Sequence, residues 1–236
     1  NVSTVFPDVT ADKLPVADKK ETAEISTRFG EKTYRISMQR VSLGEVVAKS
    51  EFLENSNRNA SLIAMYLYDD TELKSYIKKN EDNKLVVALA YLDNYEEALE
   101  SVEDVRRSLL IALIDRKITK YFSNFDGLVK KLEKDKYFLI MRQSSLEALK
   151  EQRFHILDEV KTVNIGNEMA ITLSIGVGLN ASTYIQNYEY SRIAIEMALG
   201  RGGDQAVIKD GEKIYYYGGK SQQMEKNTRV KVRVKA

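Results

Sequence analysis

The run Leu85-Val86-Val87-Ala88-Leu89-Ala90-Tyr91-Leu92 decides the fold of this 236-residue chain. Eight consecutive apolar residues between polar neighbours are typical of a strand that is buried on both faces, at the centre of a sheet. After the polar pair Asp93-Asn94, apolar residues recur at helical spacing and predict one long helix from Tyr95 to about Tyr121. The run therefore predicts a central strand that leads directly into a helix.

The sequence beyond this helix continues to alternate between strands and helices. The predicted elements are a hairpin with strands 128–132 and 137–142 around the turn 133–136, a helix over 145–162, a strand over 170–178, a helix over 188–199 and a short strand over 206–208. The order β-α-β-β-α-β-α-β is that of a ferredoxin-like core with an appended unit. The predicted fold class is therefore α/β, more strictly α+β, with an antiparallel-rich central sheet.

The residues before the central strand predict a smaller, separate domain. Its predicted elements are a β-hairpin with strands 22–29 and 33–41, a strand over 62–68 and a helix over 72–79. We therefore predict a domain at 1–79, a second at 80–213, and a linker at 214–236 that leads toward a further domain. The sequence is expected to be a fragment of a longer protein.

The composition excludes several kinds of site. With no Cys and only one His, His155, the chain has no disulfides, Cys-ligated metals or His-cluster metal sites, and a reducing compartment is expected. Lys and Arg number 36 against 35 Asp and Glu, which gives no overall attraction to nucleic acid or anionic lipid. The longest apolar runs are far shorter than the ~20 residues that span a bilayer, so no membrane segment is predicted.

Three segments are candidates for chemistry, and each also has a structural interpretation. Asp93 and Asn94 follow the central strand, where an acid can contact metal or phosphate; capping of the next helix is the favoured alternative. The turn 133–136 has no glycine, whereas a turn that cradles a triphosphate needs backbone N–H groups free of Cβ atoms. Gly200-Arg201-Gly202-Gly203-Asp204 ends a helix, so a C-cap turn is favoured over a phosphate loop.

Taken together and in order, these segments resemble the GGDEF family of nucleotide cyclases. Thr172-Leu173-Ser174-Ile175-Gly176-Val177 is similar to that family's T-x-S-x-G-[VI] strand, and Asp93-Asn94-Tyr95 to the end of its D-x-D-x-F-K motif. The turn and Tyr137 stand where the Gly-Gly-Asp/Glu-Glu-Phe hairpin belongs. Residues 188–204 resemble its last helix and the turn after it. The resemblance covers about 130 residues and implies a nucleotide-cyclase fold.

The departures from the family pattern imply that cyclase chemistry is lost. The family's first metal-binding Asp is replaced by Tyr91, and a phenol is a poor Mg²⁺ ligand at neutral pH. The two hairpin glycines are replaced by Glu133 and Lys134, and the hairpin Glu by Lys136. Leu99 stands in place of the family's guanine-contacting Asn. The inhibitory Arg-x-x-Asp motif before the hairpin is also missing.

A narrower resemblance rests on the segment 198–208, together with Tyr217-Gly218-Gly219-Lys220 and Thr228-Arg229-Val230. It is similar to membrane-anchored bacterial cyclic-di-AMP phosphodiesterases, which carry a PAS domain, a degenerate GGDEF domain and catalytic DHH and DHHA1 domains. This implies that residues 1–79 are a partial PAS-like sensor. It also implies a homodimer at the cytoplasmic face of the membrane, with the fragment itself soluble and the DHH and DHHA1 domains absent from it. Haem, a PAS ligand in some members, would here depend on Tyr or Met as axial ligand.

The resemblance further implies that the degenerate domain binds ATP and hydrolyses it slowly, so the fragment is at most a weak ATPase. The side chains expected nearest to ATP are Asp93, Asn94, Lys134, Asp135 and Lys136. The two lysines would meet phosphates as point charges, and Asp135 would hold one Mg²⁺ through water. No residue is assigned as catalytic. The alternative is a scaffold that dimerises or packs on the catalytic domains and binds no small molecule.

Overall fold

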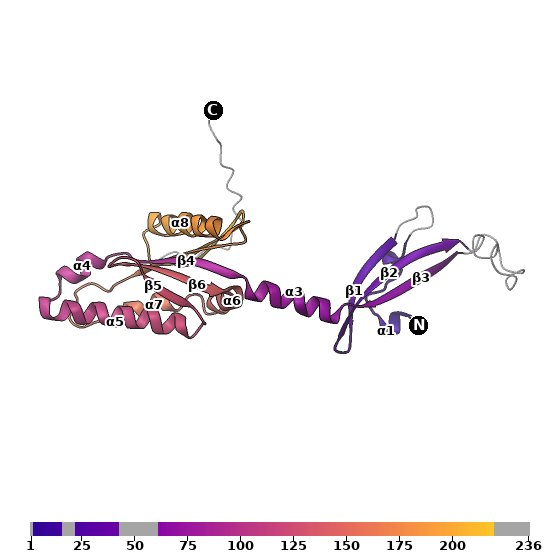
Figure 1. The fold of residues 1–236 in the computed structure, drawn as a ribbon, viewed down its shortest axis with the longest axis horizontal. Coiled ribbons are helices and arrows are strands. Elements are labelled where there is room, and N and C mark those ends of the chain that lie inside the picture. The colour runs from indigo at the N-terminus through magenta and orange to yellow at the C-terminus, as the bar shows by residue number, and fades with distance from the viewer. Residues whose placement is uncertain (1, 16–21, 43–60, 220–236) are drawn as a thin grey trace, which may run out of the picture. The chain divides into compact units, whose positions relative to one another are not determined.

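The computed structural model describes residues 2–15, 22–42 and 61–219, and the chain divides into two compact units, Asn1–Asn80 and Glu81–Ala236. Figure 1 shows their elements. Within the described part of the chain, no helix is long and apolar enough to cross a membrane.

The first unit is built on a three-stranded antiparallel sheet in the order β1-β2-β3. Its elements are α1 (Val2–Val5), η1 (Ala11–Lys13), β1 (Thr22–Phe29), β2 (Lys32–Ser42), β3 (Ser61–Asp69) and α3 (Thr71–Asn83), which runs on into the second unit. The predicted hairpin is confirmed, and Gly30 supplies the left-handed residue of its turn at φ 61°. Ile36 and Met38 on β2 are buried with Phe6 and Val9 from the N-terminal segment.

The second unit contains a six-stranded sheet in the order β5-β6-β4-β7-β8-β9. Its strands are β4 (Leu85–Leu92), β5 (Leu128–Lys131), β6 (Lys136–Arg142), β7 (Leu173–Leu179), β8 (Gln205–Asp210) and β9 (Lys213–Gly218). Only the β7–β8 pair is parallel. The predicted mixed α+β class is confirmed: β4 lies in the middle of the sheet, and residues 86–90 are almost completely buried.

Helices cover the two faces of this sheet unequally (Figure 1). One face carries α5 (Asp104–Ser123), α6 (Gln143–Glu151) and α7 (Ile156–Lys161), and the other carries α8 (Tyr184–Gly200). Contact between β7 and α8 is very close, because a Cβ on Gly176 or Gly178 would overlap the α8 backbone. The Ser-x-Gly-x-Gly pattern of β7 therefore fixes α8 directly on the sheet.

The single helix predicted over 95–121 is wrong, because α4 (Tyr95–Glu100) and α5 are separate. The Arg107 guanidinium donates to the carbonyl oxygens of Leu99 (2.9 Å) and Val102 (3.0 Å), which stabilises the break. The helix predicted over 145–162 is likewise two helices, α6 and α7. Between them Arg153 and Phe154 adopt left-handed conformations, at φ 51° and 54°, which no helix accommodates.

The predicted linker begins too early. Residues 213–218 form β9, which pairs antiparallel with β8. The physical reason is the alternation of Ile214, Tyr215 and Tyr217, whose side chains pack against the two faces of the sheet. Residues 220–236, which include the rest of the predicted linker, lie outside the described residues.

Candidate functional site

The candidate site lies at the end of the sheet where β4 stops and the β5–β6 turn begins. Leu92 N–H donates to the Asp135 carbonyl oxygen (2.9 Å), and Tyr91 pairs with Lys136 across the strands. On its other side, Tyr91 pairs with Ser174 of β7. The structure therefore brings Asp93 and the hairpin turn to the same sheet end.

Asp93 is held on both sides by polar partners. Its Oδ2 accepts hydrogen bonds from Thr172 Oγ1 (2.9 Å) and from the Asp204 backbone N–H (2.9 Å). Its own N–H donates to the Thr172 carbonyl oxygen (3.1 Å). Its Oδ1 is buried and has no hydrogen-bond partner among the described residues. Oδ2 of Asp93 therefore stabilises the fold through two hydrogen bonds, whereas Oδ1 makes none within the part of the chain that the structure describes.

The turn after α8, at Gly203 and Asp204, packs directly against the Asp93 carboxylate. Gly203 has φ 74°, and a Cβ there would lie 2.7 Å from Asp93 Cγ, so only glycine fits without displacing the acid. Asp204 follows at φ 54° and pairs with Lys161 of α7 (2.7 Å). Burial alone would lower the pKa of Lys161, but its hydrogen bonds to Asp204 and Asp158 outweigh this effect and raise it.

Asn94 joins the same network through its side-chain amide. Its Nδ2 donates to the Ala170 carbonyl oxygen (2.8 Å), and its Oδ1 accepts from Thr172 N–H (3.0 Å). Asn94 is the residue before α4, yet it makes no side-chain capping bond there. The favoured capping interpretation of this pair is therefore wrong: Asp93 and Asn94 tie β4 to the chain that enters β7.

The β5–β6 turn closes without glycine because none of its residues needs a left-handed conformation. Leu132 N–H donates to the Lys136 carbonyl oxygen (2.9 Å). Lys136 Nζ pairs with Glu133 (2.6 Å), lies 5.6 Å from the centre of the Tyr91 ring, and has its pKa raised by the Glu133 hydrogen bond. Lys134 is exposed and Asp135 is half-buried.

A cluster that the sequence did not single out anchors this hairpin to α5. Asp115 accepts hydrogen bonds from Lys131 (2.8 and 2.9 Å) and from the hydroxyl of Tyr137, which is almost completely buried. Burial and then the Asp115 hydrogen bond raise the pKa of Tyr137 far above its usual value. The available signal was an acid within the apolar-rich stretch from Leu109 to Ile118.

The predicted site residues thus lie at one end of the sheet, but most of their polar groups are already bonded to other residues of the domain. Asp93 and Asn94 are bound to the chain that enters β7, Lys136 is bound to Glu133, and the Asp135 side chain makes no hydrogen bond within the described part of the chain. Among the described residues, no group of three or more His, Cys, Asp or Glu is placed to hold a metal ion. Leu99 packs against the main core.

A comparison with protein families matches residues 90–215, just over half of the chain, to the family described as "Cyclic-di-AMP phosphodiesterase GdpP-like, GGDEF domain". Among solved structures, the active GGEEF domain of a diguanylate cyclase from Vibrio cholerae is similar at 13% identity, with a TM-score of 0.46, over 57% of this chain and 89% of that one.

Curated relatives agree with the family match. Cyclic-di-AMP phosphodiesterase PdeA of Listeria monocytogenes is 39% identical over 72% of this chain and 26% of its own length. Cyclic-di-AMP phosphodiesterase GdpP of Bacillus subtilis is 30% identical over 89% of this chain and 33% of its own length. The chain therefore spans between a quarter and a third of these relatives, and it belongs to the GdpP-like family through a GGDEF domain in its second unit.

Proposed function

We propose that the second unit is a regulatory domain of a cyclic-di-AMP phosphodiesterase and has lost diguanylate cyclase activity. The observation that carries this proposal is the commitment of Asp93 Oδ2 to Thr172 and Asp204. An acid that holds two strands and a turn together is poorly suited to move with a substrate-bound metal.

The residue at the family's first metal position supports the same conclusion. Two-metal catalysis needs anionic oxygens that bridge or face both ions. Tyr91 occupies that position, and burial raises the pKa of its phenol. It therefore remains protonated at neutral pH and supplies no anionic ligand. Since Glu133 also faces the turn, a triphosphate would meet a carboxylate where the family has glycine.

The same end of the sheet retains groups that suit ATP binding without cyclisation. Lys134 is free to reach phosphates, and Lys136 can exchange its exposed pairing with Glu133 for a phosphate oxygen. Asp135, which is half-buried, offers a carboxylate oxygen to a hydrated Mg²⁺. On this proposal ATP binds and is hydrolysed slowly.

Equilibrium dialysis of the 236-residue chain with ATP and Mg²⁺ tests this site. We expect saturable binding that is weakened about tenfold by Lys136→Met and strengthened by Glu133→Gln, which removes the competing carboxylate. The matched controls are Lys213→Met and Glu212→Gln, in the exposed β8–β9 turn at the other end of the sheet; they should change nothing. Absence of saturable binding, or binding unaffected by Asp135→Ala, would refute nucleotide binding here.

Our proposal for the longer protein that contains this chain rests on the names of its relatives and on the domain order that the resemblance implies. The parent would be a membrane-anchored dimer whose DHH and DHHA1 domains follow this segment and hydrolyse cyclic-di-AMP on the cytoplasmic side. If the second unit regulates the catalytic domains through ATP, ATP should change the phosphodiesterase rate of the whole protein. Loss of that response in a whole protein with Lys136→Met would support the proposal, and an unchanged response would contradict it.

The first unit is proposed to be PAS-like, as its three antiparallel strands permit. Haem fits it poorly. Residues 1–80 contain no His or Cys, and Met38 is enclosed by Phe6, Val9 and Ile36 in the apolar core. No role is therefore assigned to haem in this chain. A Soret band after haem is added to the 236-residue chain would overturn this assignment.

A scaffold without any ligand is the second candidate, and the Glu133–Lys136 pair at 2.6 Å favours it. In this case the hairpin tip is satisfied internally, and the domain serves only to dimerise or to pack on the catalytic domains. The dialysis experiment separates the two candidates, because a scaffold gives no saturable ATP binding in either the parent chain or Glu133→Gln.

A further inference from the structure

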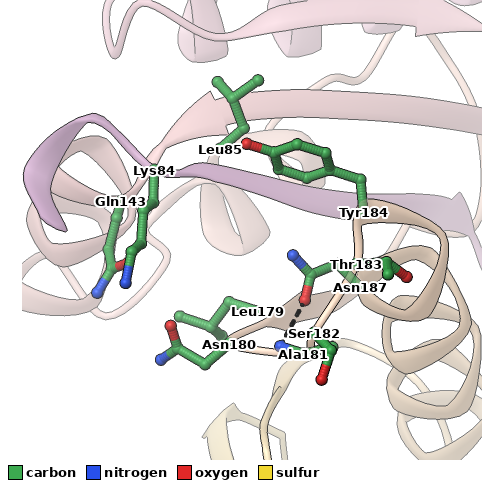
Figure 2. Close-up of a pocket in the computed structure, with 10 residues that line it drawn as sticks. All are labelled: Lys84, Leu85, Gln143, Leu179, Asn180, Ala181, Ser182, Thr183, Tyr184 and Asn187. Atoms are coloured by element: carbon green, nitrogen blue, oxygen red, sulfur yellow. Dashed lines mark hydrogen bonds between the residues drawn. The ribbon is translucent and has the colours of Figure 1, made fainter. Parts of the chain in front are cut away.

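A pocket of about 460 Å³ lies at the opposite end of the sheet from the hairpin turn. Ten residues line it (Figure 2), at the start of β4, the start of α6 and the loop that joins β7 to α8. None of the ten is an acid, and Lys84 is the single cation among them. Leu85 and Leu179 add apolar surface to a lining that is otherwise mostly polar.

Asn187 supplies an unpartnered donor to this pocket. The residue is only 5% exposed, and its Oδ1 accepts from the Ala181 N–H at 2.9 Å. That bond fixes the orientation of the amide, since the oxygen must face the N–H. The Nδ2 group has no hydrogen-bond partner among the described residues, and Figure 2 shows it directed away from Ala181 into the pocket.

The first turn of α8 adds a second source of positive potential. Thr183 caps this 17-residue helix by accepting from Gln186 N–H (3.2 Å), and Gln186 Oε1 accepts in return from Ser182 N–H (3.1 Å). These two bonds leave the N–H groups of Tyr184 and Ile185 without a helical acceptor. Such N–H groups and the helix dipole favour a negative charge at this end.

Two carboxylates are bound to residues that line the pocket. Glu81 pairs with Lys84 (2.7 Å), and Asp210 accepts from Asn180 Nδ2 (2.7 Å). Both pairs leave the Asn187 donor free, and the Gln143 amide adds a neutral polar group to the opposite wall.

We propose that this pocket binds a small oxyanion-bearing molecule, a phosphate or a carboxylate, whose oxygens accept from Asn187 Nδ2 and from the N-terminus of α8, with Lys84 at the rim. The site is separate from the hairpin turn that the ATP proposal uses, because the two lie at opposite ends of β4.

The test uses the ¹⁵N-labelled 236-residue chain and NMR titration, with inorganic phosphate in one arm and acetate in the other. We expect saturable shifts of the Asn187 side-chain amide and of Tyr184 N–H, and the arm with the tighter binding identifies the preferred oxyanion. Asn187→Asp keeps the acceptor for Ala181 but replaces the donor by an anion, so affinity should fall about tenfold or more.

Lys84→Met should weaken binding severalfold, whereas Lys120→Met, a lysine in a separate surface pocket on α5, should not. Several outcomes would overturn the proposal: shifts that never saturate, equal losses for Lys84→Met and Lys120→Met, or unchanged affinity in Asn187→Asp. Shifts confined to the hairpin turn would also overturn it while leaving the ATP proposal standing.

Discussion

Replacing Asp93 by alanine should destabilise the second unit, whereas the same change at Asp135 should not. The two acids lie at the same end of the sheet, but only Asp93 holds distant segments together. Its Oδ2 accepts from Thr172 Oγ1 and from Asp204 N–H, both at 2.9 Å. The side chain of Asp135 makes no comparable bond among the described residues.

The magnitude follows from the donors left behind. A buried donor that loses its acceptor costs about 1–3 kcal/mol. Asp204 N–H would lose its acceptor outright, and the Thr172 hydroxyl would have to turn toward water. We therefore expect Asp93→Ala to cost about 2–4 kcal/mol, which for a unit of this size lowers the melting temperature by roughly 4–16 °C. Asp135→Ala should stay within about 0.5 kcal/mol of the parent.

Urea unfolding followed by far-ultraviolet circular dichroism measures this difference, and amide hydrogen exchange locates it. In Asp93→Ala the Asp204 amide should exchange faster, whereas amides of β1 and β2 in the first unit should be unaffected. Equal stability of Asp93→Ala and the parent would refute the structural role of Asp93. Equal destabilisation by Asp135→Ala would show that acids at this sheet end act through charge, not through these bonds.

Three further predictions follow from packing and protonation. Gly176→Ala should cost about 3 kcal/mol or more in urea unfolding because its Cβ would overlap α8, whereas Gly200→Ala, with no atom within 4 Å of its Cβ, should be neutral. Tyr137→Phe should cost about 1–2 kcal/mol by losing its bond to the α5 carboxylate; an unchanged midpoint would contradict this. The hydrogen bond from Lys32 lowers the pKa of Asp69 to about 2, so its stabilising effect is present above an unfolded pKa of about 4 and is lost as pH falls through 2. Asp69→Asn should therefore weaken the loss of first-unit stability as the pH falls toward 2, measured as the free energy of unfolding. An unchanged dependence on pH would contradict this role of Asp69.

Strands β4, β5 and β6 of the second unit could be predicted because their signals are local, whereas β9 was missed. The apolar run 85–92 coincides with β4, and the hairpin strands differ from β5 and β6 by only a residue at their inner ends. The two broken helices could not be predicted in this way. Their breaks depend on the guanidinium of Arg107 and on left-handed conformations at Arg153 and Phe154, which apolar spacing does not encode.

The candidate site shows the same limit. Sequence order placed Asp93 at the end of the central strand and close to the hairpin turn. Its partners, Thr172 and Asp204, are 79 and 111 residues further along the chain. Local sequence therefore favours capping of the next helix, because it carries no signal for bonds over such separations. The position of Gly203 after a helix predicts a helix-ending turn, but sequence order does not reveal that this glycine contacts Asp93.

The central claim is that this sheet end has kept the GGDEF fold without its cyclase chemistry. The most direct test is to incubate the 236-residue chain with GTP and Mg²⁺ and to measure cyclic-di-GMP by mass spectrometry. With Tyr91 at one metal position and Asp93 bound to Thr172 and Asp204, we expect no product. Accumulation of cyclic-di-GMP that Asp135→Ala abolishes would contradict it.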